Sequence, residues 1–259
     1  MEKFLCFTIL VTGVLCYGND GLDDFRPNDK NSVVGGAPIT IFQAPYQAQI
    51  LYDGETICGA TLISNQFLVT AAHCLNLPKK SYKVIVGSHY PQVGKQQDIE
   101  FIKSHEHYKK RTFENDIGII KLKHPIEINP AQKPIKFLHR DPKAGEYVKI
   151  SGFGHEKTGA YTISKQLKAA VVPVIDSTLC QLGYNHEVGN VEVMDVMFCA
   201  GAGETDTCQG DSGGPAVIRG KLAGIVSFGL DCASSMTPGI YTRANQYIDW
   251  VLKHTGVQV

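Results

Sequence analysis

The 259-residue sequence lacks an excess of either charge sign. It contains 25 Lys and Arg residues against 25 Asp and Glu residues, so its formal net charge is zero. Its one short basic run, residues 109–111, is followed closely by Glu114 and Asp116. Because proteins that bind nucleic acids present a basic face to the phosphate backbone, this balance argues against a nucleic-acid partner.

Long hydrophobic runs are also scarce, and only the N-terminal one stands out. It covers residues 4–17, follows Lys3, and is too short for a membrane-spanning helix of about 20 residues. A basic residue, an apolar stretch and then small or polar residues from Gly18 onward are typical of a secretory signal peptide. We therefore expect a signal peptide at residues 1–18, a secreted protein and no membrane association. A buried N-terminal helix is the alternative.

Cysteines are few, but their number is even once the expected leader is removed. Two of the eight, Cys6 and Cys16, lie in that leader. None of the others forms a C-x-x-C pair, and no N-x-Ser/Thr acceptor occurs, so neither a zinc motif nor a glycosylation site is present. An even count in a secreted chain predicts three disulfides, although spacing alone leaves their pairing open. The cysteines concerned are Cys58, Cys74, Cys180, Cys199, Cys208 and Cys232.

Helical periodicity is rare in the rest of the sequence. Residues 19–32 are polar and acidic, and strand-like sequence begins at Val33. From there, short apolar or alternating runs are broken by Gly, Pro, Asn and Asp, which predicts an all-β sandwich or barrel. Residues 245–254 are the main exception and predict a short C-terminal helix. The expected strands cover residues 46–52, 61–63, 67–70, 83–86, 117–122, 147–151, 166–172, 215–218 and 221–228.

A stretch that contains Pro125, Pro130 and Pro134 divides the sequence after residue 32 into near halves. Two similar β units joined at this stretch are one interpretation, and a long surface loop inside a single sandwich is the other. No internal repeat is visible that decides between them.

One stretch of the sequence is typical of a nucleophile. Ser212 lies in residues 210–215 (GDSGGP), with Asp211 before it and Cys208 four residues upstream. Flanking glycines tolerate positive φ and close backbone approach, so the hydroxyl can be exposed while main-chain N–H groups point at the group that it attacks. We therefore interpret Ser212 as a candidate catalytic serine.

A serine hydroxyl needs a base, and His73 is the candidate among the nine histidines. His73 lies in residues 70–74 (TAAHC), directly after an apolar strand, and Asp116 lies at the start of another buried strand. A carboxylate that bonds the far ring nitrogen would fix the tautomer and stabilise the imidazolium formed during attack. Taken singly, a structural histidine and a strand-end cap are the alternatives for these two residues.

Together, these motifs resemble those of the trypsin/chymotrypsin family of serine endopeptidases. The matching segments are residues 33–36 (VVGG), 68–74 (LVTAAHC), 115–117 (NDI) and 208–215 (CQGDSGGP), in the order and spacing of that family. The resemblance implies two six-stranded antiparallel β-barrels, divided near residues 125–137, with a short C-terminal helix. It also implies an activation propeptide at residues 19–32 and a peptidase domain at residues 33–259.

The resemblance implies a catalytic role for each motif residue. Ser212 is the nucleophile, His73 the general base and then acid, and Asp116 the carboxylate that orients His73. The backbone N–H groups of Gly210 and Ser212 form the oxyanion hole. The implied disulfides are Cys58–Cys74, Cys180–Cys199 and Cys208–Cys232.

Substrate specificity follows from the same resemblance. It places Asp206 at the base of the pocket that receives the side chain before the scissile bond, where a buried carboxylate favours a cation. We therefore expect cleavage after Arg or Lys. Asp231 and a long Cys180–Cys199 loop depart from the family pattern, and their effect on specificity stays open. The implied substrate-binding residues are Asp206, Thr207, Ser227, Phe228, Gly229 and Gly239.

The resemblance further implies activation by proteolysis. A new α-amino group on Val33 pairs with Asp211 and thereby orders the turn at residues 210–212. Because Ser32 is not basic, an Arg- or Lys-specific enzyme does not activate itself, and we expect an activating protease of different specificity. In combining this junction with a trypsin-like pocket, the sequence is similar to the serine-protease allergens of mites.

The expected partners are protein or peptide substrates, the activating protease and protein inhibitors, and the enzyme is expected to be a monomer. No metal or other cofactor is expected; the family's calcium loop in particular is not, because residues 87–97 contain no Asp or Glu. A protease-fold protein that serves only as a binding or decoy module is the rival interpretation. Such relatives usually lose a triad residue, and here His73, Asp116 and Ser212 are all present.

Overall fold

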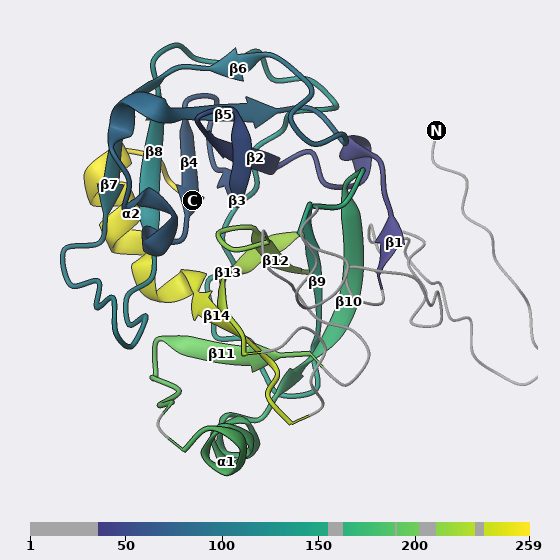
Figure 1. Cartoon of the computed structure of the whole chain (residues 1–259), viewed down its shortest axis with the longest axis vertical. Helices are drawn as coiled ribbons and strands as arrows, with labels where there is room; N and C mark the ends of the chain where they lie inside the picture. The colour runs from purple at the N-terminus through teal and green to yellow at the C-terminus, as the bar shows by residue number, and fades with distance from the viewer. Residues whose placement is uncertain (1–35, 155–162, 190, 202–210, 231–235) are drawn as a thin grey trace, which may run out of the picture.

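Short antiparallel strands build most of this computed structural model, which describes residues 36–154, 163–189, 191–201, 211–230 and 236–259. Within these residues the strands form two sheets, each rolled into a barrel (Figure 1). Each barrel has six main strands and one further strand of two residues at its edge. The predicted fold of two barrels with a C-terminal helix is therefore confirmed, and a single sandwich is excluded.

The strands of the first barrel enclose an apolar core. Its strand order is β6-β5-β2-β3-β4-β8-β7. The β2–β3 hairpin turns at Asp53 and Gly54, whose φ angles of 50° and 91° suit a two-residue turn with positive φ at both positions. Apolar side chains such as Ile50, Leu68 and Ile119 are completely buried inside. The strands are β2 (Gln47–Tyr52), β3 (Glu55–Leu62), β4 (Phe67–Thr70), β5 (Tyr82–Val86), β6 (Gln96–Gln97), β7 (Ile99–Ser104) and β8 (Gly118–Leu122).

Except for β1, the second barrel follows a connection, residues 123–146, that contains the three prolines. Its strand order is β1-β10-β11-β14-β13-β12-β9, and an additional pairing between β10 and β9 closes the sheet on itself. Inside it, the rings of Phe198 and Tyr241 stack with centroids 5.1 Å apart. The strands are β1 (Ala37–Pro38), β9 (Tyr147–Gly152), β10 (Lys168–Ile175), β11 (Met197–Ala200), β12 (Pro215–Ile218), β13 (Lys221–Phe228) and β14 (Gly239–Arg243).

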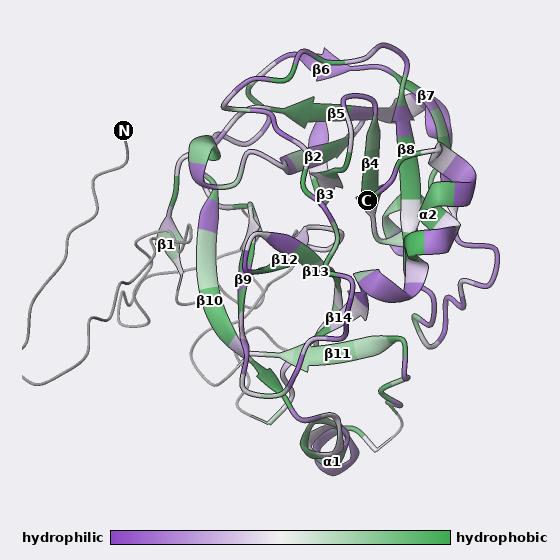
Figure 2. Cartoon of the chain, turned by 180° about the vertical axis from the view of Figure 1, so that it is seen from behind, coloured by the Kyte–Doolittle hydropathy of each residue, from purple (hydrophilic) through white to green (hydrophobic). Residues whose placement is uncertain are grey.

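Several elements differ from the sequence-based expectation. Helix α1 (Ser177–Glu187) was not predicted, and it lies at the edge of the second barrel near β11 (Figure 1). Its side chains do not form one continuous apolar face, because Leu179 and Leu182 are exposed, and hydrophobic and hydrophilic residues alternate around it (Figure 2). The Asp176 side chain caps its first turn by accepting hydrogen bonds from two backbone N–H groups. The strands that were also missed are β1, β6, β7, β11 and β14.

The predicted C-terminal helix is present. A short 3₁₀ turn, η4 (Ala244–Tyr247), leads into α2 (Ile248–Thr255), which ends where Gly256 adopts a left-handed φ of 69°. Figure 1 shows α2 packed beside the first barrel, near β7 and β8. Among the described residues, no helix has the length and hydropathy that crossing a membrane requires.

The loop between β5 and β6 is held by the buried amide of Gln49. Its Nε2 donates to the Tyr90 carbonyl at 3.0 Å, and its Oε1 accepts from the Gln92 backbone N–H at 2.9 Å and from Thr56 Oγ1 at 3.2 Å. Gln92 in turn donates to Glu55 Oε2 at 2.8 Å. A neutral side chain of the first barrel therefore organises this loop.

Replacing Gln49 by Met keeps the side-chain length but removes these hydrogen bonds. We expect Gln49→Met to lower the free energy of unfolding by about 2 kcal/mol, because it removes three hydrogen bonds made by a buried side chain. Denaturant unfolding measures the change. The matched control Gln96→Met, on the exposed strand β6, should stay within about 0.5 kcal/mol of the wild type.

A chelator tests whether a bound calcium ion also holds this loop. EDTA should leave the wild-type unfolding midpoint unchanged, because the Gln49 amide already bonds the loop backbone. A Gln49→Met protein as stable as the control, or a wild type weakened by EDTA, would contradict this account.

Candidate functional site

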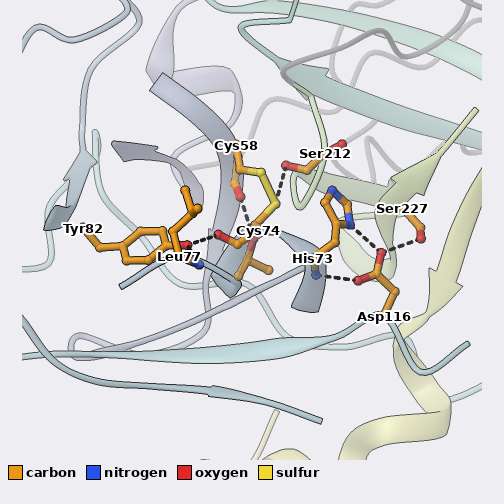
Figure 3. Close-up of a disulfide and its surroundings, with 10 residues drawn as sticks. Cys58, His73, Cys74, Leu77, Tyr82, Asp116, Ser212 and Ser227 are labelled. Carbon is orange, nitrogen blue, oxygen red and sulfur yellow. Dashed lines mark hydrogen bonds and ion pairs between the residues drawn. A yellow bond between two sulfur atoms is a disulfide. The ribbon is translucent and has the colours of Figure 1, made fainter. Parts of the chain in front are cut away.

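The predicted catalytic residues come from both barrels and meet where the barrels join. His73 lies in the 3₁₀ turn η2 (Ala72–Leu75), which follows β4, and Asp116 lies shortly before β8. Ser212 lies in the loop before β12, and Ser227 lies on β13. Figure 3 shows the His73 ring between Asp116 and the Ser212 loop.

Asp116 is the buried centre of this group. Its side chain is 0% exposed, whereas that of His73 is 22% exposed. Asp116 Oδ2 contacts His73 Nδ1 at 2.8 Å and accepts a hydrogen bond from Ser227 Oγ at 2.6 Å, and Oδ1 accepts from the His73 backbone N–H at 2.9 Å. Because a carboxylate accepts hydrogen bonds, these contacts place a proton on His73 Nδ1, which donates it to Asp116. The other ring nitrogen is left to face Ser212 (Figure 3).

The position of His73 is fixed by the residues around its turn. The Cys58–Cys74 disulfide ties the turn to β3, with an S–S distance of 2.01 Å. Tyr82 Oη donates to the Cys74 carbonyl at 2.6 Å and accepts from the Leu77 backbone N–H at 3.1 Å. Burial raises the pKa of Tyr82, so the phenol stays protonated and keeps this donor role.

The segment before β8 holds Asp116 from the other side. Asn115 has a left-handed φ of 57°, and its Oδ1 accepts from Tyr247 Oη at 2.9 Å. Thr242 Oγ1, on β14, donates to the Asp116 carbonyl at 2.9 Å. Burial raises the pKa of Tyr247, which keeps its hydroxyl a donor. Bonds from β14 and from Tyr247 in the C-terminal segment therefore fix the backbone at Asp116 and its neighbour Asn115.

The Ser212 loop is anchored through its backbone. The Ser212 carbonyl accepts from the Gly59 N–H at 2.8 Å, and the Gly213 N–H donates to the Val226 carbonyl at 2.8 Å. Gly213 has a φ of 80°, and a Cβ there would lie 2.1 Å from Thr70 Oγ1. Only glycine fits this position, which explains part of the GDSGGP motif.

Asp211 is buried beside this loop, at 2% exposure. Its Oδ1 accepts from the Gly154 backbone N–H at 2.7 Å, and its carbonyl accepts from Gly214 N–H at 2.9 Å. A Cβ at Gly152 would lie 2.0 Å from Asp211 Oδ1, so this carboxylate occupies space that only glycine leaves free. The orientation of Asp211 is thereby coupled to the turn that carries Ser212.

An aromatic pair flanks His73. The Phe113 ring meets the His73 ring edge-on, with centroids 5.6 Å apart, and lies 4.8 Å from the Phe228 ring. Phe228 was predicted from the sequence, but Phe113 was missed. Phe113 has a left-handed φ of 56°, and neither a motif nor a periodicity marks it.

Some of the remaining predicted residues are described by the structure, and the others lie outside the described residues. Ser227 was predicted to bind substrate, and the structure places its hydroxyl on Asp116. A Cβ at Gly229 would meet the Gly239 Cα at 3.9 Å, so these two glycines face each other.

The predicted Cys180–Cys199 disulfide is present, with a sequence separation of 19. Outside the described residues lie Val33, Asp206, Thr207, Cys208, Gly210, Asp231 and Cys232.

One group of potential metal ligands occurs in the described part of the chain. The ligand atoms of Cys58, His73 and Cys74 lie within 4.8 Å of one another. The two sulfur atoms are joined in a disulfide and are not thiolates, so this group does not have the donors that a zinc site uses.

Comparison with known proteins places this geometry in a family. The family model described as Trypsin matches residues 33–251. Trypsin delta of Drosophila erecta is 33% identical over 256 residues, covering 96% of this chain and 99% of its own. The trypsin of Sus scrofa is 35% identical over 234 residues, covering 88% of this chain and 97% of its own.

A solved structure agrees with these sequence relatives. Neuropsin, described as a serine protease expressed in the limbic system of mouse brain, superposes with a TM-score of 0.77 at 30% identity. The match covers 85% of this chain and 98% of neuropsin. None of these relatives supports the narrower likeness to mite allergens. The family match, the identities and the shared fold show that the chain belongs to the trypsin family and is a serine endopeptidase.

Proposed function

We propose that this serine endopeptidase is secreted, is made as an inactive precursor, and cleaves peptide bonds after Arg or Lys through Ser212, His73 and Asp116. The observation that carries the catalytic part is the 2.8 Å contact between His73 Nδ1 and the buried Asp116 carboxylate, with Ser212 beside the opposite edge of the ring (Figure 3).

The proposed reaction has two halves that use the same residues. Ser212 Oγ attacks the scissile carbonyl carbon while His73 Nε2 takes its proton, and the Asp116 carboxylate stabilises the imidazolium. The N–H groups of Gly210 and Ser212 stabilise the tetrahedral oxyanion, and His73 then gives its proton to the leaving amine. Water attacks the resulting ester with His73 again as the base, which releases the acid and restores Ser212.

Cleavage after a basic residue is supported by charge and space. By its place in the family motif, Asp206 supplies a carboxylate at the base of the pocket, and burying it is favourable only with a cationic partner. Gly229 and Gly239 face each other without side chains, which leaves room for the long side chain of Arg or Lys. Several of the relatives are trypsins by name.

Activation is supported by the position of Asp211 and by where the family match begins. The Trypsin model starts at Val33, the residue whose α-amino group the precursor lacks. Asp211 is buried, and its carbonyl bonds the same turn that carries Ser212. A terminal ammonium that pairs with this carboxylate would therefore set the Ser212 turn. Residues 1–18 and 19–32 would serve as signal peptide and propeptide.

The Asp116→Asn variant tests the triad. It preserves shape but favours the tautomer that cannot act as base, so kcat should fall about 10⁴-fold, the loss known for the same change in the family's template triad. Turnover is measured per active site on one peptide amide. The control Asp249→Asn, on the exposed side of α2, should leave kcat unchanged. An Asp116→Asn enzyme within about tenfold of the wild type would rule out this role.

A paired set of peptides tests the specificity. For substrates that differ only in the residue before the scissile bond, kcat/KM should favour Arg over Phe or Leu by about 10³-fold or more, because only Arg neutralises the pocket carboxylate. Asp206→Ser should remove most of that preference. Faster cleavage after Phe or Leu by the wild type would contradict the proposal.

An N-terminal extension tests the activation step. Protein that begins at Val33 should be fully active, whereas protein that begins at Ser32 should lose at least about 100-fold in kcat/KM, since breaking a buried ion pair costs about 3 to 5 kcal/mol. Cleaving Ser32 from the extended protein should restore the activity. Equal activity of the two proteins would refute the proposed mechanism.

A further inference from the structure

Residues 191–196, between α1 and β11, have no regular secondary structure and lie inside the long Cys180–Cys199 loop. This segment is held at both ends by side chains of other elements. At the far end, Arg243 Nε donates to the Asp195 carbonyl at 3.0 Å and to the Met197 carbonyl at 2.7 Å. At the near end, the partner is Gln181 on α1.

The Gln181 amide bonds two backbone groups of this segment at once. Its Nε2 donates to the Val191 carbonyl at 2.8 Å, and its Oε1 accepts from the Val193 N–H at 2.7 Å. Nε2 also contacts Asn185 Oδ1, one turn along α1, at 2.9 Å. One half-buried side chain therefore supplies the hydrogen bonds that a neighbouring strand would otherwise make to these backbone groups.

The segment fixed in this way contributes to an apolar cluster that reaches the catalytic histidine. Val191, Val193 and Met194 pack against this cluster, and so do Phe113 and Phe228. Phe113 in turn contacts the His73 ring. The buried members of the cluster are Cys180, Tyr184, Met197, Cys199 and Ile240.

Phe113 and Phe228 are both partly exposed, and Phe113 lies against the ring of His73, the proposed general base. We propose that Gln181 is a positioning residue for specificity: by clamping residues 191–194 onto the cluster, it sets the aromatic wall formed by Phe113 and Phe228. That wall selects peptides with an apolar side chain next to the cleaved residue, since such a side chain is buried against the rings. This inference rests on the proposed function of His73 and Ser212.

The test uses three substrates that share the residue after which the wild type cleaves best. Two are tetrapeptide amides with Leu or Gly directly before that residue, and the third is a single-residue ester that is too short to reach the wall. Gln181→Met should lower the preference for Leu over Gly about 10-fold, a change of about 1.4 kcal/mol, through a higher KM. The ester should change by less than about twofold.

Two further variants separate the clamp from general damage to the fold. Asn185→Ala removes the neighbouring contact of the same amide but leaves both clamp bonds, and it should behave as the wild type. Val193→Ala keeps the clamp but shortens the apolar contact of the segment, and it should lower the Leu preference in the same direction as Gln181→Met. All rates are normalised to titrated active sites, so that unfolded protein does not count.

Each outcome decides the question. An equal loss on all three substrates, or an unchanged Leu preference in Gln181→Met, would overturn the proposal. A wild type that cleaves but does not distinguish Leu from Gly overturns this inference and leaves the proposed function intact. A wild type that cleaves none of the substrates overturns the proposed function as well.

Discussion

A buried carboxylate at the junction of two barrels must be met by hydrogen-bond donors, because an unpaired charge there costs several kcal/mol. Asp116 receives donors from the η2 turn of the first barrel through His73 and from β13 of the second barrel through Ser227. Thr242 adds a bond to its carbonyl. The position of the barrels relative to each other and the orientation of His73 therefore depend on the same group.

The turn that carries Ser212 is held through its backbone. Its place beside the His73 ring (Figure 3) is supported by the bond from the Gly59 N–H to the Ser212 carbonyl and by Gly213, which adopts a conformation that other residues avoid. Asp211 links the same turn to the interior. In our proposal, the clamp at Gln181 supports the aromatic wall of Phe113 and Phe228, so that chemistry and substrate choice use separate supports near His73.

The sequence alone predicts the parts of the site that local motifs encode. The serine turn and the histidine turn follow from short segments with fixed residue types. The two disulfides of the described residues follow only from the family resemblance that these segments carry, because spacing alone leaves the pairing open. The helix α1 was missed because it lacks a continuous apolar face, and Phe113 was missed because its role depends on contacts made across the fold. Gln49 and Gln181 bond backbone groups that no sequence pattern pairs with them.

We propose that Asp116 is responsible for the reactivity of Ser212, and covalent labelling measures that reactivity without a turnover assay. An organophosphonate should modify protein that begins at Val33 at Ser212 alone, with one label per chain detected by mass spectrometry of peptides. The Asp116→Asn protein should be labelled far more slowly under the same conditions. A label on another residue, or equal labelling rates for the two proteins, would contradict the central claim.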